Sequence, residues 1–292
     1  MAVIMISRGS YSMGGEVAEK VAQKIGYDCL SREVLLEASK DYNIPEVKLI
    51  HAYENAPSIL DRFSHGKKKY IAYMQAALLK HLMKDNIVYH GLAGHFFVRH
   101  IPHALKVRIV TEMESRVKIV MERDKISREH ALRFINKLDG QRRKWSLQLH
   151  GIDLWNPTLY DLVLQIDKIT ADDAVDTVCQ IVSLKQFQTT PESKRAMDDL
   201  ALSTEVKAFL MDVKPNIEVC AENGLIYVQI EAPVTPGADW MHKMEEIAKT
   251  IPEVKEIRVI SKDVSPSSYP YASTQDRESP KGLMDTYFTE LG

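Results

Sequence analysis

Short apolar runs alternate with amphipathic stretches over the first part of the chain, and this alternation predicts its fold. Residues 2–7 form a continuous apolar run, as expected for a strand that is buried on both faces of a parallel sheet. A glycine-rich loop follows the run. Apolar side chains then recur with helical spacing at Ala18, Val21, Ala22 and Ile25. The first elements are therefore expected to be a strand, a loop and a helix.

The same alternation continues and predicts an α/β domain over residues 1–185. Strands that alternate with helices imply a parallel sheet with helices on both faces. Further strands are expected at residues 87–90, 105–110 and 162–166. Further helices are expected at residues 71–83, 114–123 and 128–138, and a last one after residue 170. Gly26 is placed to end the first helix, whereas Ser127 and Thr170 are placed to cap later ones.

A different pattern begins after a polar stretch in the second half of the chain. Residues 186–198 lose their periodicity and are predicted to be a linker. Residues 199–262 show a helical stripe, two alternating stretches around an Asn223-Gly224 turn, a second helix and a last strand. This order predicts a small α+β domain. Residues 263–292 are rich in Ser and Pro without an apolar period, so we expect a mostly disordered tail.

Composition and charge add mainly exclusions. The formal net charge is −2, from 38 basic and 40 acidic side chains, which gives no bulk electrostatic argument for a nucleic-acid partner. The three cysteines lie far apart and form no CxxC pair, so free thiols in a reducing compartment are expected rather than disulfides or zinc. The N-terminal apolar run is too short for a signal peptide, and no apolar segment is long enough to span a membrane. These features predict a cytoplasmic protein.

The loop after the first strand carries the strongest chemical signal. Gly9 and Gly14 have the spacing of the phosphate-loop pattern G-x-x-x-x-G-K-[ST], in which backbone N–H groups and a helix N-terminus bind phosphate. However, Gly15 stands in place of the lysine and Glu16 in place of the Ser or Thr. Glu16 would either hold Mg²⁺ or repel a nucleotide. The nucleotide-binding residues predicted here are Gly9, Ser10, Tyr11, Ser12, Met13, Gly14, Gly15 and Glu16. A plain strand-to-helix turn is the alternative.

Three stretches of the chain can be compared with a known family. They read ISRGSYSMGGEVAEKVAQKIG, GLAGHFFVRHIPHALKVRIV and DGQRRKWSLQLHGIDLWNPTLYDLVLQID. Together they resemble the cytidylate-kinase-like family of P-loop nucleoside monophosphate kinases, over about residues 2–183. The family's loop often reads GSGGR, where an arginine replaces the charge of the missing lysine, but this chain has Glu16 there. The resemblance implies phosphoryl transfer from ATP, with Mg²⁺, to CMP or a related nucleoside monophosphate.

Arginines elsewhere in the chain would supply the remaining positive charge. Arg142 and Arg143 lie in a segment placed like the family's lid, and the resemblance implies that they close over the migrating phosphoryl group as catalytic residues. Arg116 and Arg123 lie seven residues apart and share a helix face, so they are expected to bind the nucleotide. Arg32 corresponds to an acceptor-binding arginine of the family. The alternative for the paired arginines is a solvated surface.

Three departures from the family pattern support a second hypothesis. Glu16, Ser31 and Leu92 each remove or reverse a charge that the family carries. Residues 199–262 also resemble the BON domain, which is associated with the binding of ligands or membrane surfaces. The alternative function is therefore a catalytically impaired, nucleotide-sensing regulatory protein that signals to an unknown ligand or partner through this BON-like domain. A scaffold that binds no nucleotide is a third possibility.

Overall fold

The computed structural model shows two compact units, Met1–Met197 and Asp198–Gly292. It describes residues 1–31, 34, 38, 40–42, 66–91, 94–211, 217–230 and 238–261. Some sequence predictions lie outside the described residues. These are the acceptor role of Arg32, the altered position Leu92 and the tail at 263–292.

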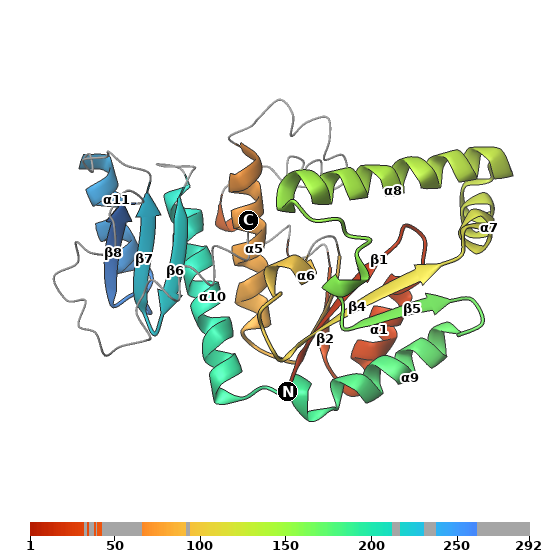
Figure 1. Cartoon of the computed structure of the whole chain (residues 1–292), viewed down its shortest axis with the longest axis horizontal. Coiled ribbons are helices and arrows are strands. Elements are labelled where there is room, and N and C mark those ends of the chain that lie inside the picture. Colours follow the sequence, from red (N-terminus) through yellow and green to blue (C-terminus); the bar gives the residue numbers. More distant parts are fainter. Residues whose placement is uncertain are drawn as a thin grey trace. The chain divides into compact units, whose positions relative to one another are not determined.

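A parallel sheet with the strand order β2-β3-β1-β4-β5 forms the centre of the first unit (Figure 1), as the alternation of strands and helices predicts. Its strands are β1 (Val3–Arg8), β2 (Asp28–Leu30), β3 (Ile87–His90), β4 (Ala104–Thr111) and β5 (Leu162–Ile166). The sequence pattern does not predict β2, because three residues are too few to show a period. Since β1 is the middle strand, the loop after it opens at the centre of the sheet's carboxyl edge.

Helices cover both faces of this sheet. They are α1 (Gly14–Ile25), α5 (Gly66–Leu82), α6 (Gly94–Phe97), α7 (Met113–Asp124), α8 (Arg128–His150) and α9 (Ala171–Val182). Apolar side chains of α1 and α9 pack with those of β1, β4 and β5 into one buried core. Figure 1 shows α1 and α9 on one side of the sheet and α8 on the other.

Alternation along β4 decides which of its side chains face the α8 side of the sheet. Leu105, Val107 and Ile109 belong to the core under α1 and α9. Because successive side chains of a strand point to opposite faces, Arg108 and Val110 face the other side. A charged residue in the middle of a buried strand is thereby placed away from the main apolar core.

The helix ends follow the predicted signals, but α8 is longer than predicted. Gly26 ends α1 in a left-handed conformation with φ 70°, and the Ser127 side chain accepts a hydrogen bond from the His130 N–H at the start of α8. α8 continues past Gly140 to His150 and ends at Gly151, which has φ 67°. No described atom lies within 4 Å of the position of a Gly140 side chain, whereas Trp145 and Ser146 further along the helix are buried.

The capping box of α9 gives a first prediction about stability. Thr170 Oγ1 accepts from the Asp173 N–H at 3.1 Å, and Asp173 Oδ2 accepts from the Thr170 N–H at 2.9 Å. We expect Thr170→Ala to lower the free energy of unfolding by about 1–2 kcal/mol, because one backbone donor of the helix loses its partner. Chemical denaturation measures the change. Thr177→Ala in the same helix is the matched control, and an equal loss in both variants would contradict the capping role.

The second unit holds a separate small sheet. It contains most of α10 (Pro191–Leu210), then β6 (Glu218–Glu222), β7 (Leu225–Ile230), α11 (Ala238–Thr250) and β8 (Glu256–Ser261). β6 and β7 form an antiparallel hairpin whose turn residues Asn223 and Gly224 have positive φ, and β8 pairs with β7 in parallel. One face of the sheet packs against apolar side chains of α10 and α11. The predicted helix, hairpin, helix and strand are all present.

The predicted linker at residues 186–198 is wrong in its second half. α10 begins at Pro191, and its first turn is capped by Thr190 and Ser193, whose side-chain oxygens each accept a hydrogen bond from the other's N–H, at 3.2 and 2.9 Å. A proline at the first position of a helix and a hydroxyl before it are helix-start signals, which outweigh the polar composition of the stretch. Among the described helices, none combines the length and the apolar character that a membrane span needs.

Candidate active site

The loop between β1 and α1 is held in place by hydrogen bonds to β4 and within itself. The Gly9 N–H donates to the Ile109 carbonyl at 3.2 Å, Ser12 Oγ donates to the Gly9 carbonyl at 2.9 Å, and Thr111 Oγ1 donates to the Ser12 carbonyl at 3.1 Å. Tyr11 and Met13 adopt the left-handed region with φ 57° and 61°. For residues other than glycine this costs about 1 kcal/mol or more each, so the surrounding bonds fix an unusual loop shape.

The first turn of α1 presents backbone N–H groups at the end of this loop. The first N–H groups of a helix have no partner inside the helix, and with the helix dipole they attract anions. A side chain at Gly14 would place its Cβ 2.7 Å from Cβ of Arg8, so only glycine fits there. At Gly15 the same test meets only the His90 ring, at 3.6 Å, which is ordinary contact. The loop therefore has the shape of an anion cradle but lacks a lysine.

Glu16 does not face this cradle. Its carboxylate pairs with Lys20 Nζ at 2.9 Å, one helical turn further on, and Lys20 also pairs with Asp172 of α9 at 2.9 Å. These hydrogen bonds to Glu16 and Asp172 raise the pKa of Lys20. Glu16 is exposed and does not line the pocket described below. The expected repulsion between Glu16 and a nucleotide is thus reduced by a neighbouring cation.

This arrangement gives a second prediction. We expect Glu16→Gln to change the affinity for ATP by no more than about 2-fold, because the lost charge is exposed and already paired. Calorimetric titration with ATP measures it, and Glu19→Gln on the same helix is the control for an exposed carboxylate. A tenfold gain in affinity for Glu16→Gln alone would show that this carboxylate faces the nucleotide.

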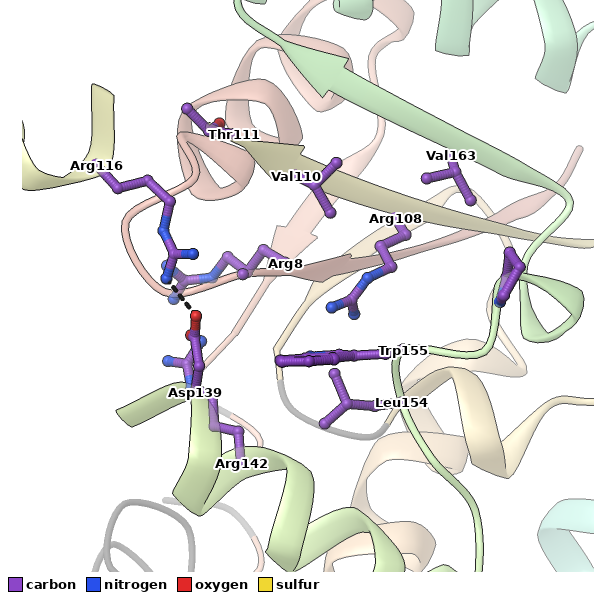
Figure 2. A pocket seen from close by; sticks show the side chains of 12 residues that line it. Arg8, Arg108, Val110, Thr111, Arg116, Asp139, Arg142, Leu154, Trp155 and Val163 are labelled. Atoms are coloured by element: carbon purple, nitrogen blue, oxygen red, sulfur yellow. Dashed lines mark hydrogen bonds and ion pairs between the residues drawn. The ribbon is translucent and has the colours of Figure 1, made fainter. Parts of the chain in front are cut away.

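A pocket of about 270 Å³ opens beside the loop, at the carboxyl ends of β1 and β4 and next to Val163 near the start of β5 (Figure 2). Arginines from four elements line it, namely Arg8 of β1, Arg108 of β4, Arg116 of α7 and Arg142 of α8. Asp139 is the one carboxylate among the residues that line this pocket. The remaining lining residues are Gly9, Val110, Thr111, Leu154, Trp155, Pro157 and Val163. Such an excess of positive charge in a concave site favours an anionic ligand.

Arg116 and Asp139 hold the loop in place through hydrogen bonds to the Ser10 backbone. Arg116 is 8% exposed, and its Nε donates to the Ser10 carbonyl at 2.7 Å. Its Nη2 donates to Asp139 Oδ2 at 2.6 Å, and Asp139 Oδ1 accepts from the Ser10 N–H at 3.4 Å (Figure 2). Ser10 Oγ is buried and has no hydrogen-bond partner among the described atoms. Arg116 therefore lines the pocket and holds the loop at Ser10, and its predicted contact with a nucleotide stays a prediction.

The other predicted arginines divide between the pocket and its surroundings. Arg142 lines the pocket, whereas Arg143 does not. Arg143 donates through Nε and Nη2 to Asp153 Oδ2 at 2.9 and 2.5 Å, and its guanidinium lies 4.7 Å from the centre of the Trp155 ring. The same contact holds the pKa of Asp153 below its usual range. Arg143 thus supports the pocket wall at Trp155.

Arg123 contacts the loop from outside the pocket. Its guanidinium lies 4.6 Å from the centre of the Tyr11 ring and donates to both carboxylate oxygens of Asp124 at 2.6 Å. Arg116 and Arg123 lie seven residues apart on α7, and each reaches one residue of the loop. The shared helix face that the sequence predicts is therefore turned toward the loop, although Arg123 is placed to pack on Tyr11 and not to line the pocket.

Sequence reasoning missed several residues of the pocket. Arg8 precedes the first loop glycine, and Arg108 interrupts an apolar strand, which is a signal in itself because a charge is rarely buried there. Asp139 gives no signal in the sequence, because its partners Ser10 and Arg116 lie 129 and 23 residues away. Trp155 is 51% exposed, unlike the buried Trp145.

Neutral polar groups lie behind Arg108. The Tyr160 hydroxyl lies 3.2 Å from His95 Nε2 and donates to the Leu154 carbonyl at 2.8 Å. Burial, with the nearby positive charge of Arg108, lowers the pKa of His95 to about 3. His95 is therefore uncharged at neutral pH, so it does not neutralise a ligand and serves as a hydrogen-bonding group.

The described residues do not build a metal site of their own. No group of three or more His, Cys, Asp or Glu side chains among them is arranged to hold a metal ion. Asp139 is the carboxylate at the pocket, and both of its oxygens already accept hydrogen bonds. A Mg²⁺ ion fits this site only as part of a nucleotide complex, in which phosphate oxygens and water supply its ligands.

The sequence of residues 3–168 matches the model of the cytidylate kinase-like family. This chain belongs to that family. A cytidylate kinase from Sulfolobus acidocaldarius is 25% identical over 185 residues, which are 63% of this chain and 96% of the relative. A cytidylate kinase from Pyrobaculum neutrophilum is 41% identical over 76 residues. This match covers 25% of this chain and 41% of the relative.

Solved structures of low sequence identity also match this chain. An uncharacterized protein from Eubacterium ventriosum is 21% identical with a TM-score of 0.49, and the match covers 63% of this chain and 100% of that one. A shikimate kinase from Bacteroides thetaiotaomicron is 9% identical with a TM-score of 0.40, and the match covers 63% of this chain and 99% of that one. As a family member, the protein combines the kinase-like unit with a second unit that the family model does not reach.

Proposed function

We propose that this protein transfers a phosphoryl group from ATP to a nucleoside monophosphate, with CMP as the preferred acceptor. The observation that carries the proposal is the joining of an anion-cradling loop with four arginines in one pocket. Two phosphate-bearing ligands need positive charge on several sides, and the arginines of this pocket come from four different elements. The identity of CMP as acceptor comes from the family alone.

In the proposed reaction, the backbone N–H groups of Gly9 to Gly15 and the start of α1 hold the phosphates of the donor. An oxygen of the acceptor's phosphate attacks the γ-phosphorus, and the bond from this phosphorus to the bridging oxygen breaks, so that ADP leaves. Arg8 and Arg142 line the pocket and stabilise the charge on the migrating group in place of the loop lysine. Mg²⁺, when bound with the nucleotide, supplies further neutralisation of the phosphates.

The acceptor's own site is only partly within the described residues. Arg32 remains a proposed contact for the acceptor's phosphate, on the basis of the family pattern. Trp155, which is half exposed and lines the pocket, offers a flat apolar surface near the arginines.

A coupled assay of ADP formation tests this proposal. The protein is incubated with ATP and Mg²⁺ and, in separate reactions, with CMP, dCMP, UMP or AMP. We expect turnover with at least one of them and the highest kcat/KM with CMP. Absence of turnover with all four acceptors, in a preparation that binds ATP by calorimetry, would reject catalysis and leave nucleotide binding in place.

The second candidate is a nucleotide-sensing regulatory protein without catalysis. The specific observation in its favour is Gly15, which leaves the loop without the lysine that normally contacts the transferred phosphate. The BON-like second unit would then read out nucleotide binding and pass it to a ligand or partner. ATP binding without turnover, together with an ATP-dependent change in protease cleavage within residues 198–261, would support this alternative.

A further inference from the structure

Arg108 is a buried cation that makes no ion pair with a carboxylate in the part of the chain that the structure describes. Its side chain comes from the middle of β4 and is 6% exposed. Its Nη1 donates to Ser7 Oγ at 3.2 Å and to the Tyr160 hydroxyl at 3.1 Å. Both partners are uncharged. Among the described residues, no carboxylate lies within ion-pair distance of this guanidinium. The charge of Arg108 contributes to the lowered pKa of Asp153, but Asp153 itself pairs with Arg143 at 2.5 Å.

Such a charge is unfavourable unless an anion joins it. A guanidinium does not lose its proton in proteins, so burial cannot neutralise it. A buried charge without a partner is therefore rare in folded proteins, and where it lines a pocket it indicates a ligand. The one carboxylate of this pocket, Asp139, is bound by Arg116 and by the loop.

The anchors of Arg108 also define where its ligand would lie. Ser7 is the register partner of Arg108 on β1 and stands two residues before Gly9. Tyr160 accepts from Arg108 and donates to the Leu154 carbonyl at 2.8 Å, so its hydroxyl cannot turn away easily. The guanidinium thus lies at the root of the loop, and Figure 2 shows it pointing into the pocket together with Trp155.

A guanidinium has five N–H donors, and only those on Nη1 are engaged here. The remaining donors on Nε and Nη2 form one edge of the fork that binds two oxygens of a phosphate. Transfer between two phosphates requires that both lie next to each other. An anion on Arg108 would lie directly beside one held by the loop amides.

We propose that Arg108, oriented by Ser7 and Tyr160, binds the phosphate monoester of the acceptor nucleotide. That this nucleotide is the acceptor of a phosphoryl group rests on the proposed function. The binding of its phosphate monoester by Arg108 does not depend on that function. Arg108 would be the contact that separates a nucleotide from its uncharged nucleoside, since it recognises the phosphate and not the base.

Equilibrium titration of the full-length protein with CMP and cytidine, in the absence of ATP, tests the proposal without requiring turnover. We expect Arg108→Gln to weaken CMP binding by about 30-fold, as for a lost hydrogen-bonded charge, and to leave cytidine binding within about 2-fold. Lys106→Gln is the matched control, because Lys106 lies on the same face of β4 but pairs with Asp161 at 3.2 Å outside the pocket. It should bind CMP like the unchanged protein.

The thermal midpoint separates this role from a structural one. Because Arg108→Gln removes an uncompensated buried charge while keeping a polar side chain, its Tm should not fall. A lower Tm with unchanged CMP affinity would assign Arg108 a purely structural role and overturn the proposal. If the variant does not fold, a crystal structure of the unchanged protein with CMP decides: phosphorus within about 4 Å of the guanidinium supports the proposal, and a phosphate elsewhere overturns it.

The results also separate this proposal from the proposed function. Loss of CMP binding in Arg108→Gln, in a protein that never turns over, upholds the Arg108 site and rejects the kinase. Turnover with an unchanged KM for CMP in Arg108→Gln upholds the kinase and rejects the site. No binding of CMP by the unchanged protein rejects the site, whatever ATP does.

Discussion

Replacement of Arg142 by alanine is expected to lower kcat with ATP and CMP by about 10²–10³-fold, the usual effect of removing one charged donor from a transferred phosphoryl group. Arg142 lines the pocket from α8, and the loop has no lysine to share this role. The KM for each substrate should change less than kcat, because the positive charge acts mainly on the transition state. Steady-state kinetics with the coupled assay measures both.

The neighbouring arginine provides an unusually close control. Arg143→Ala removes the same charge at the next position of the helix, but its guanidinium binds Asp153 and packs on Trp155. We expect a loss of less than about 10-fold, from a less firmly held Trp155. Equal losses in the two variants, or full activity in Arg142→Ala, would contradict the assignment of Arg142 as the lid arginine of the pocket.

Lowering the pH from 7 to 5 is expected to reduce the free energy of unfolding by about 4 kcal/mol through two histidines. Burial lowers the pKa of His95 to about 3 and that of His150 to about 4. In the unfolded chain both titrate near the ordinary value of 6.5. Between these values the unfolded state binds more protons than the folded state, so stability falls as the pH falls below about 6.5.

Guanidinium chloride unfolding at pH 7 and pH 5 measures this loss. The double variant His95→Gln and His150→Phe should lose less stability between the two pH values than the unchanged protein. Phe fits at His150 because the ring already packs against Phe96, Phe97 and Trp145. His130→Gln is the control, since His130 is exposed at the start of α8. A pH dependence that is the same in the double variant would show that other groups cause the acid loss.

The sequence predicts the bounds of two strands, although β3 is buried throughout and β5, predicted as buried, is exposed at Val163 and Gln165. Residues 87–90 and 162–166 are the bounds of β3 and β5, because their apolar, largely β-branched or aromatic residues are flanked by polar ones. The second half of α8 was missed, since its buried residues, such as Trp145 and Ser146, form no apolar stripe with helical spacing. The first half of α10 was missed because its composition is polar and only its cap marks the start.

The site was predictable only in its local parts. The loop follows from glycine spacing, and a Glu16–Lys20 pair follows from a separation of four residues. By contrast, Arg142 lines the pocket and Arg143 binds Asp153, and this difference depends on which side of α8 faces the sheet. The long uninterrupted helix sets this orientation. Predicting the position of Arg108 beside Ser7 requires the register of β4 against β1, which no local sequence pattern contains.

In a pocket whose positive charge comes from arginines, the pH dependence of ligand affinity is set by the ionisation of the ligand. Guanidinium groups keep their charge at any pH at which the fold survives. A phosphate monoester, in contrast, gains its second negative charge near pH ~6. The affinity for such a ligand should therefore rise as the ligand becomes a dianion. A plot of affinity against pH would then report the ionisation of the nucleotide and not that of the protein.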